Sequence, residues 1–203
     1  MPSKPLSFPK PFGNLLDIEF SKIRLELRSF ADIGLVGLPN AGKSTFLDAV
    51  SSAKPKIGDY PFTTIKPNLG TIKYFDKSFV FADIPGLIEG ASQGTGLGIK
   101  FLKHISRTKA LLIFLDPHNT EYDFENQLKI LINEMRHFDS KLLQKDIWIV
   151  LNKIDTVDNL DENLTAIDKY IPSELKIHQI RGISSISKQG VKELFDELFK
   201  KLT

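Results

Sequence analysis

The segment 37–44 reads Gly-Leu-Pro-Asn-Ala-Gly-Lys-Ser and fits the spacing G-x-x-x-x-G-K-S/T, which is typical of a loop that binds phosphate groups. Gly37 and Gly42 allow the backbone to curve around an anion, so that its N–H groups face the phosphates. Lys43 is expected to reach the terminal phosphates, and the Ser44 hydroxyl is a suitable ligand for Mg²⁺. The spacing therefore predicts a site for a nucleotide and its magnesium ion.

A second group of residues has the chemistry needed at the outer phosphate and the metal. Asp83 and Gly86 form the pattern D-x-x-G after the apolar run 78–82. This places a carboxylate where it holds magnesium through a water, and a glycine N–H near the γ-phosphate. Thr64, in the segment 60–64, offers a hydroxyl that completes the metal shell when the γ-phosphate is present. The expected metal ligands are Ser44, Thr64 and Asp83.

A third group predicts which base is bound. Asn152-Lys153-Ile154-Asp155 matches N-K-x-D and follows another apolar run. The Asp155 carboxylate can accept two N–H bonds from the Watson–Crick edge of guanine, whereas adenine lacks that pair of donors. Asn152 is expected to brace the loop, and the Lys153 stem to cover the face of the base. Ser184-Ser185-Ile186 would bring a backbone N–H to guanine O6, so these segments together favour a guanine nucleotide.

The elements that must position these residues alternate between strands and helices. We expect strands at 20–27, 31–37, 78–82, 110–115 and 147–151, and helices at 44–53 and 121–138. Apolar residues from Val191 to Leu202 form one stripe on a closing helix. This order predicts an α/β fold, a P-loop NTPase of the Ras-like type, with a mostly parallel sheet between helices. Each motif then lies at a strand end or in a connecting loop. Residues 1–22, rich in proline, are expected to be a lead-in, and 23–203 the nucleotide-binding domain.

Composition narrows the function further. The 203 residues are 41% hydrophobic and 26% charged, as in an ordinary globular domain, and the formal net charge of +2 does not by itself imply nucleic-acid binding. The absence of cysteine excludes disulfides and thiolate metal sites. The longest apolar run, Ala110 to Leu115, is too short to cross a bilayer, and the proline-containing N-terminus does not look like a signal peptide. We therefore expect a protein that stays inside the cell.

The sequence resembles the GTP-binding domain of the Obg family of ribosome-associated GTPases. The resemblance is close at 31–37, 59–64 and 67–70, is closest in DIPGLIEGASQGTGLGIKFLKHISRT at 83–108, and extends over about 23–202. It implies slow, magnesium-dependent hydrolysis of GTP in the cytoplasm and association with the large ribosomal subunit. The nucleotide contacts that it and the motifs imply are Gly37, Leu38, Pro39, Asn40, Ala41, Gly42, Lys43, Ser44, Thr45, Phe62, Thr63, Thr64, Ile65, Lys66, Asp83, Ile84, Pro85, Gly86, Asn152, Lys153, Ile154, Asp155, Ser184, Ser185 and Ile186.

Two departures from that family pattern affect the expectations. Family members generally carry an N-terminal glycine-rich domain, which residues 1–22 do not resemble, so we expect an excised or truncated GTP-binding domain. Ser185 stands where the last motif usually has alanine, a change expected to cost little because a backbone N–H makes the contact.

The catalytic step is less directly indicated by the sequence. Leu87 stands where Ras-like enzymes place a glutamine that orients water. The expected catalytic residues are Lys43, Thr64, Gly86 and Asn40. The Asn40 amide oxygen is a candidate ligand for a K⁺ ion beside the phosphates, although Asn40 also suits a left-handed turn that only shapes the loop.

Other readings stay open. The chain could be a GTP-gated binding module whose turnover is incidental, and direct RNA binding is disfavoured because no basic stripe with interleaved aromatics is present.

His104 and Arg107 are interpreted as solvated positions on a helix rather than as a base and an arginine finger. His118, His137 and His178 lack the spacing of metal ligands.

Overall fold

The computed structural model describes residues 31–57, 67–83 and 108–202, and the strand expected at 20–27 lies outside these ranges. Within them, one sheet of seven strands has the order β2-β3-β4-β1-β5-β6-β7. The strands are β1 (Ile33–Gly37), β2 (Lys56–Ile57), β3 (Asn68–Tyr74), β4 (Lys77–Asp83), β5 (Ala110–Leu115), β6 (Asp146–Leu151) and β7 (Ile177–Gly182).

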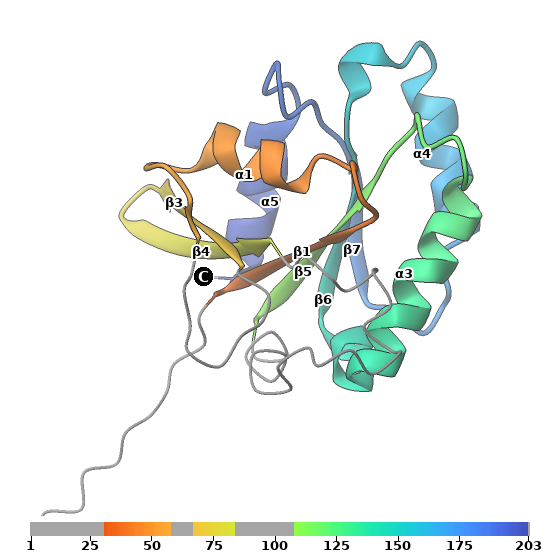
Figure 1. Ribbon diagram of the computed structural model, residues 1–203, viewed down its shortest axis with the longest axis horizontal. Helices are drawn as coiled ribbons and strands as arrows, with labels where there is room; N and C mark the ends of the chain where they lie inside the picture. The colour runs from red at the N-terminus through yellow and green to blue at the C-terminus, as the bar shows by residue number, and fades with distance from the viewer. Residues whose placement is uncertain (1–30, 58–66, 84–107, 203) are drawn as a thin grey trace, which may run out of the picture.

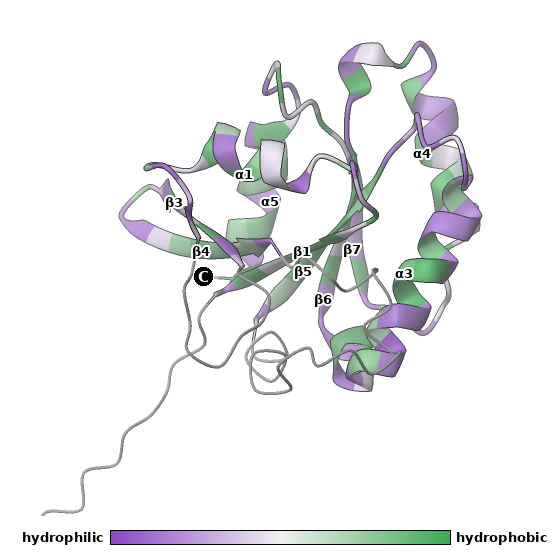
Figure 2. Ribbon diagram, viewed as in Figure 1, coloured by the Kyte–Doolittle hydropathy of each residue, from purple (hydrophilic) through white to green (hydrophobic). Residues whose placement is uncertain are grey.

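The centre of the sheet is parallel. β1 pairs with β4 and β5, and β5, β6 and β7 continue the parallel series. All residues of β1 and β5 are buried, and Figure 2 shows the hydrophobic character of these central strands. Strands covered on both faces have to be apolar throughout, which is why they appear in the sequence as short continuous runs.

The other end of the sheet is antiparallel. β3 pairs with β2 and β4 in this sense, and a two-residue turn at Phe75 and Asp76 joins β3 to β4. Sequence patterns did not indicate β3, whose residues alternate in part between buried and exposed. The predicted α/β fold with a mostly parallel sheet is therefore confirmed, with an antiparallel ribbon added at one edge.

Helices cover both faces of the sheet (Figure 1). One core cluster joins the sheet to α1 (Lys43–Val50) and α5 (Val191–Leu202), and the other joins it to α3 (Phe124–Phe138) and α4 (Leu160–Lys169). Short 3₁₀ turns, η2 (Ser140–Gln144) and η3 (Ile154–Thr156), precede and follow β6. The apolar stripe predicted on the closing helix is confirmed by the burial of Val191, Leu194, Leu198 and Phe199. None of the helices in the described residues has both the length and the apolar character needed to traverse a bilayer.

The predicted helix boundaries were wrong by a few residues, for local reasons. α1 ends at Val50 rather than at residue 53, because Ser51 is extended and its N–H bonds to Leu47 O. α3 begins at Phe124 rather than at residue 121, because the Asp123 side chain caps it by accepting from the Asn126 N–H at 2.8 Å.

Candidate nucleotide site

Parallel pairing brings the loops that carry the motifs to one edge of the sheet. The register places Gly37 beside Phe114, and Leu151 beside both Leu115 and Gly182. The residues that follow β1, β5, β6 and β7 therefore emerge next to one another. Such an edge, at the carboxyl ends of parallel strands, is the usual binding position in open α/β sheets.

The phosphate loop needs glycine for steric reasons at two positions. Gly42 has φ of +88°, and a Cβ there would lie 2.2 Å from Asn152 Nδ2. A Cβ on Gly37 would lie 2.8 Å from the carbonyl oxygen of Phe114. Asn40 is exposed and also left-handed, with φ of +64°. The loop is thus packed tightly against neighbouring strand ends on its inner side and open at Asn40.

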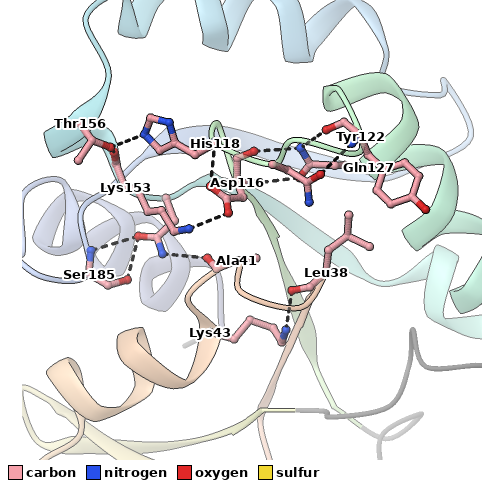
Figure 3. A network of polar contacts seen from close by, with 12 residues as sticks. Leu38, Ala41, Lys43, Asp116, His118, Tyr122, Gln127, Lys153, Thr156 and Ser185 are labelled. Atoms are coloured by element: carbon pink, nitrogen blue, oxygen red, sulfur yellow. Dashed lines mark hydrogen bonds and ion pairs between the residues drawn. The ribbon is translucent and has the colours of Figure 1, made fainter.

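Lys43, the lysine of the loop, is turned back onto the loop's own backbone. Its Nζ donates to the carbonyl of Gly37 at 2.8 Å and to that of Leu38 at 3.1 Å, the latter bond being drawn in Figure 3. Burial lowers the pKa of this ammonium below its ordinary value, and the nearby Asp83 carboxylate opposes part of that shift. Phosphate charge next to Lys43 would favour the protonated form in the same way.

Ser44 and Asp83 fit a magnesium ion. Ser44 Oγ donates to Asp83 Oδ2 at 2.6 Å, across 39 residues of sequence. Asp83 is 3% exposed, and within the described part of the chain its second oxygen, Oδ1, is buried without a hydrogen-bond partner. A buried carboxylate oxygen that lacks a donor suits a hard cation, and hydroxyl and carboxylate oxygens are the ligand types that magnesium prefers. The third expected ligand, Thr64, lies outside the described residues.

Asn152 connects three of the loops. Its Nδ2 donates to Ala41 O in the phosphate loop at 2.9 Å, and its Oδ1 accepts from Ser185 N at 3.1 Å and from Ser185 Oγ at 2.8 Å. The expected bracing role is therefore present and extends to the last motif. The Ser185 N–H makes one of these bonds, and the buried Ser185 hydroxyl, which alanine would lack, supplies a further one. If the Ser185 N–H also donates to guanine O6, that bond would have to share or replace its present bond to Asn152 Oδ1.

Lys153 is anchored on a carboxylate that the motifs did not identify. Its Nζ contacts Asp116 Oδ2 at 2.6 Å. Asp116 follows β5 as Asn152 follows β6, and Gln127 fixes the Asp116 backbone by accepting from its N–H at 3.0 Å and donating to its carbonyl at 2.9 Å. A cavity of about 570 Å³ lies between this loop and phosphate-loop residues 38–40. Asp116 thus links the predicted base-recognition segment to helix α3.

Only some of the remaining predicted nucleotide contacts lie in the part of the chain that the structure describes. Asp155 and Ile186 are both exposed, with Ile186 at 79%, and Ile154 and Ser184 are buried. Thr45 is exposed on α1. The expected contacts that lie outside the described residues are Phe62, Thr63, Thr64, Ile65, Lys66, Ile84, Pro85 and Gly86. The histidine and arginine at 104 and 107 lie there too.

The three histidines in the described segments do not form a metal-binding group there. His118, His137 and His178 all lie in described segments, and within those segments no group of three or more histidine, aspartate or glutamate side chains is arranged to hold a metal ion. His118 and His178 each contact another side chain instead, Thr156 and Asp146 respectively.

The strand order, the phosphate loop and the Asn152 connections define a Ras-like P-loop GTPase domain. The chain belongs to the family of 50S ribosome-binding GTPases, whose family model matches residues 32–153.

Curated relatives agree with the resemblance found in the sequence. The chain is 48% identical over 183 residues to GTPase Obg of Chlorobaculum tepidum, covering 90% of this chain and 52% of that protein. It is 45% identical over 186 residues to GTPase Obg of Pelodictyon phaeoclathratiforme, covering 91% of this chain and 52% of that protein. The resemblance to the Obg family is confirmed, and the chain spans about half the length of these relatives.

Solved structures show the same fold at low sequence identity. The G domain of the FeoB iron transporter of T. maritima has a TM-score of 0.62 at 20% identity, covering 84% of this chain and 98% of that one. A GTP-binding protein from Sulfolobus solfataricus in complex with GDP has a TM-score of 0.63 at 20% identity, covering 84% and 53%. These similarities support the architecture alone.

Proposed function

We propose that this chain binds GTP and GDP and slowly hydrolyses GTP to GDP and phosphate, acting as a molecular switch. The observation that carries the proposal is the connection through Asn152, which ties the phosphate loop to both predicted base-recognition segments. It leaves Asp155 exposed beside them, free to accept from a base. A loop for phosphate and a carboxylate for guanine are then held at a fixed separation, as a guanine nucleotide requires.

The phosphate end of the site has residues for the hydrolysis chemistry. Lys43 neutralises charge on the phosphates, and Ser44 and Asp83 would hold a magnesium ion. When bound, magnesium would supply charge stabilisation for the phosphates. Asn40, exposed at the edge of the loop, offers an amide oxygen for K⁺. Thr64 and Gly86 are the further catalytic residues that we propose for sensing the γ-phosphate.

Nucleotide titration tests the binding step. The chain should bind GTP and GDP and reject ATP. Asp155→Asn replaces an acceptor by a donor, so GDP affinity should fall at least about tenfold and xanthine nucleotide should gain, since a charged hydrogen bond contributes roughly 1.5–3 kcal/mol. Asp158→Asn is a matched control, because Asp158 is also exposed and lies three residues further along. Unchanged GDP affinity in Asp155→Asn would show that the guanine assignment is wrong.

A single-turnover measurement tests the enzymatic step. Hydrolysis of bound GTP should exceed a blank without protein, and Lys43→Ala should abolish the excess. Tight GTP binding with no excess hydrolysis would favour the GTP-gated binding module instead.

The wider role that we propose is action on the large ribosomal subunit in the cytoplasm. The match to a family of 50S ribosome-binding GTPases supports it. Co-sedimentation with large subunits, compared between a non-hydrolysable GTP analogue and GDP, tests this role. A parallel measurement with ribosomal RNA alone, at two salt concentrations, distinguishes action on the ribosomal subunit from direct binding to RNA.

A further inference from the structure

The loop after β5 contacts the guanine-recognition loop at two separate points (Figure 3). The first is the ion pair between Asp116 Oδ2 and Lys153 Nζ at 2.6 Å. The second joins His118 Nε2 to Thr156 Oγ1, also at 2.6 Å. Asp155, the predicted acceptor for guanine, lies in sequence between these two anchored residues. The segment that carries Asp155 is therefore contacted on both sides.

The hydrogen-bond pattern assigns a direction to the His118 contact. Thr156 Oγ1 donates its single hydrogen to Lys153 O at 2.7 Å. The hydroxyl therefore has no hydrogen left for the imidazole, and His118 must donate from Nε2–H. The His118 backbone N–H donates to Asp116 Oδ1 at 3.0 Å, so one carboxylate orients both anchors.

The anchored loop has a backbone conformation that needs support. Lys153 has φ of +62°, in the left-handed region, where a residue with a side chain is unfavourable. Its carbonyl accepts from both the N–H of Thr156 at 3.1 Å and the Thr156 hydroxyl. The hydroxyl that His118 contacts therefore belongs to the turn that carries Asp155.

We propose that His118 is a positioning residue for guanine selectivity, acting through Thr156 on the Asp155 carboxylate. The proposal rests on the proposed function, because it assumes that Asp155 accepts from the base. It assigns to the loop after β5 a role in base recognition that the sequence motifs do not contain.

Selectivity between guanine and hypoxanthine gives a direct measurement. Guanine offers Asp155 two donors, N1–H and the 2-amino group, whereas hypoxanthine offers N1–H only. A displaced carboxylate is poorly aligned for two bonds at once, so His118→Ala should weaken GDP binding about threefold to tenfold and IDP binding less, which lowers the GDP-to-IDP affinity ratio.

The matched variants separate positioning from general stability. His118→Gln keeps a donor near the place of Nε2 and should retain the ratio, as should His137→Ala, which removes an exposed histidine in the last turn of α3. Thr156→Val should lower the ratio, and adding His118→Ala to it should lower the ratio no further.

Titration of these variants with GDP and IDP gives distinguishable outcomes. A parent that prefers GDP, with a lower ratio in His118→Ala and a retained ratio in His118→Gln, supports the proposal. A parent that prefers GDP, with the same ratio in His118→Ala, overturns the proposal and leaves the proposed function intact. A parent that binds neither nucleotide overturns the proposed function, and this inference with it.

Discussion

The connection made by Asn152 can be tested without any nucleotide. Asn152→Ala removes three hydrogen bonds, one to Ala41 O and two from Ser185. Asn152 is 1% exposed, so solvent does not replace these bonds directly. The Ala41 carbonyl and the Ser185 N–H both remain in buried residues after the substitution.

The size of the effect follows from those two stranded groups. A buried polar group left unpaired costs about 1–3 kcal/mol, so the variant should lose about 2–6 kcal/mol of unfolding free energy. A total stability of about 5–15 kcal/mol means that this loss is a large fraction. For a domain of this size, about 2–4 °C of Tm accompanies each kcal/mol, so a central loss of about 4 kcal/mol lowers Tm by about 8–16 °C.

Thermal unfolding of the nucleotide-free chain is the appropriate assay, because bound ligand would add its own stabilisation. Ser185→Ala is the control: it removes one bond to Asn152 and leaves the backbone bond, so it should cost about 1 kcal/mol and about 2–4 °C. A loss in Asn152→Ala no larger than in Ser185→Ala would refute the view that Asn152 holds the loops together.

Two further predictions concern the salt and the pH. Replacing Na⁺ by K⁺ at equal ionic strength should raise GTP turnover several-fold, and Asn40→Gly should abolish that gain with little change in GTP affinity, because glycine accepts the left-handed backbone at φ +64° but lacks the amide oxygen; equal turnover in both salts would exclude the cation. Burial raises the pKa of Asp146, but hydrogen bonds from Lys176 and His178 outweigh it and hold that pKa below its ordinary value. Asp146 therefore stabilises the fold above its unfolded pKa of about 3.9, so Asp146→Asn should lower Tm at neutral pH and the difference should shrink below about pH 4; a difference that persists undiminished in acid would contradict the assignment.

The parallel core was predictable from the sequence, and the antiparallel edge was not. The expected strand 110–115 coincides with β5, because a strand covered on both faces must be apolar at every position. β3 lacks such a run because its buried face includes Gly70. A Cβ there would lie 2.1 Å from Ser51 Oγ and 2.6 Å from Leu47 Cδ1. Leu47 of α1 and Ser51, which follows that helix, fill this position, so the packing surface belongs to another segment of the sequence.

The candidate site also has one part that the sequence predicted and one part that it did not. The phosphate loop and the N-K-x-D segment are consecutive residues, so their chemistry can be recognised from spacing. Asp116 and His118 act on residues 37 and 38 positions away, and neither forms a local pattern. A signal was nonetheless present: Asp116 follows an apolar strand, as Asn152 does. Polar residues at the ends of parallel strands are candidates for such contacts even where no motif surrounds them.

These contacts bear on how the proposed base site is prepared before a nucleotide arrives. Asn152 and Asp116 follow neighbouring strands β6 and β5, and in the structure each bonds to an adjacent loop. The bonds that the loops make to one another form on folding, so their ordering cost is met then rather than during binding. When the acceptor is held in place in advance, a ligand with the right pair of donors binds with a more favourable free energy. A ligand that lacks one of the donors loses more of that binding free energy. For that reason, weakening either contact should reduce base selectivity more than it reduces the rate of hydrolysis at saturating GTP.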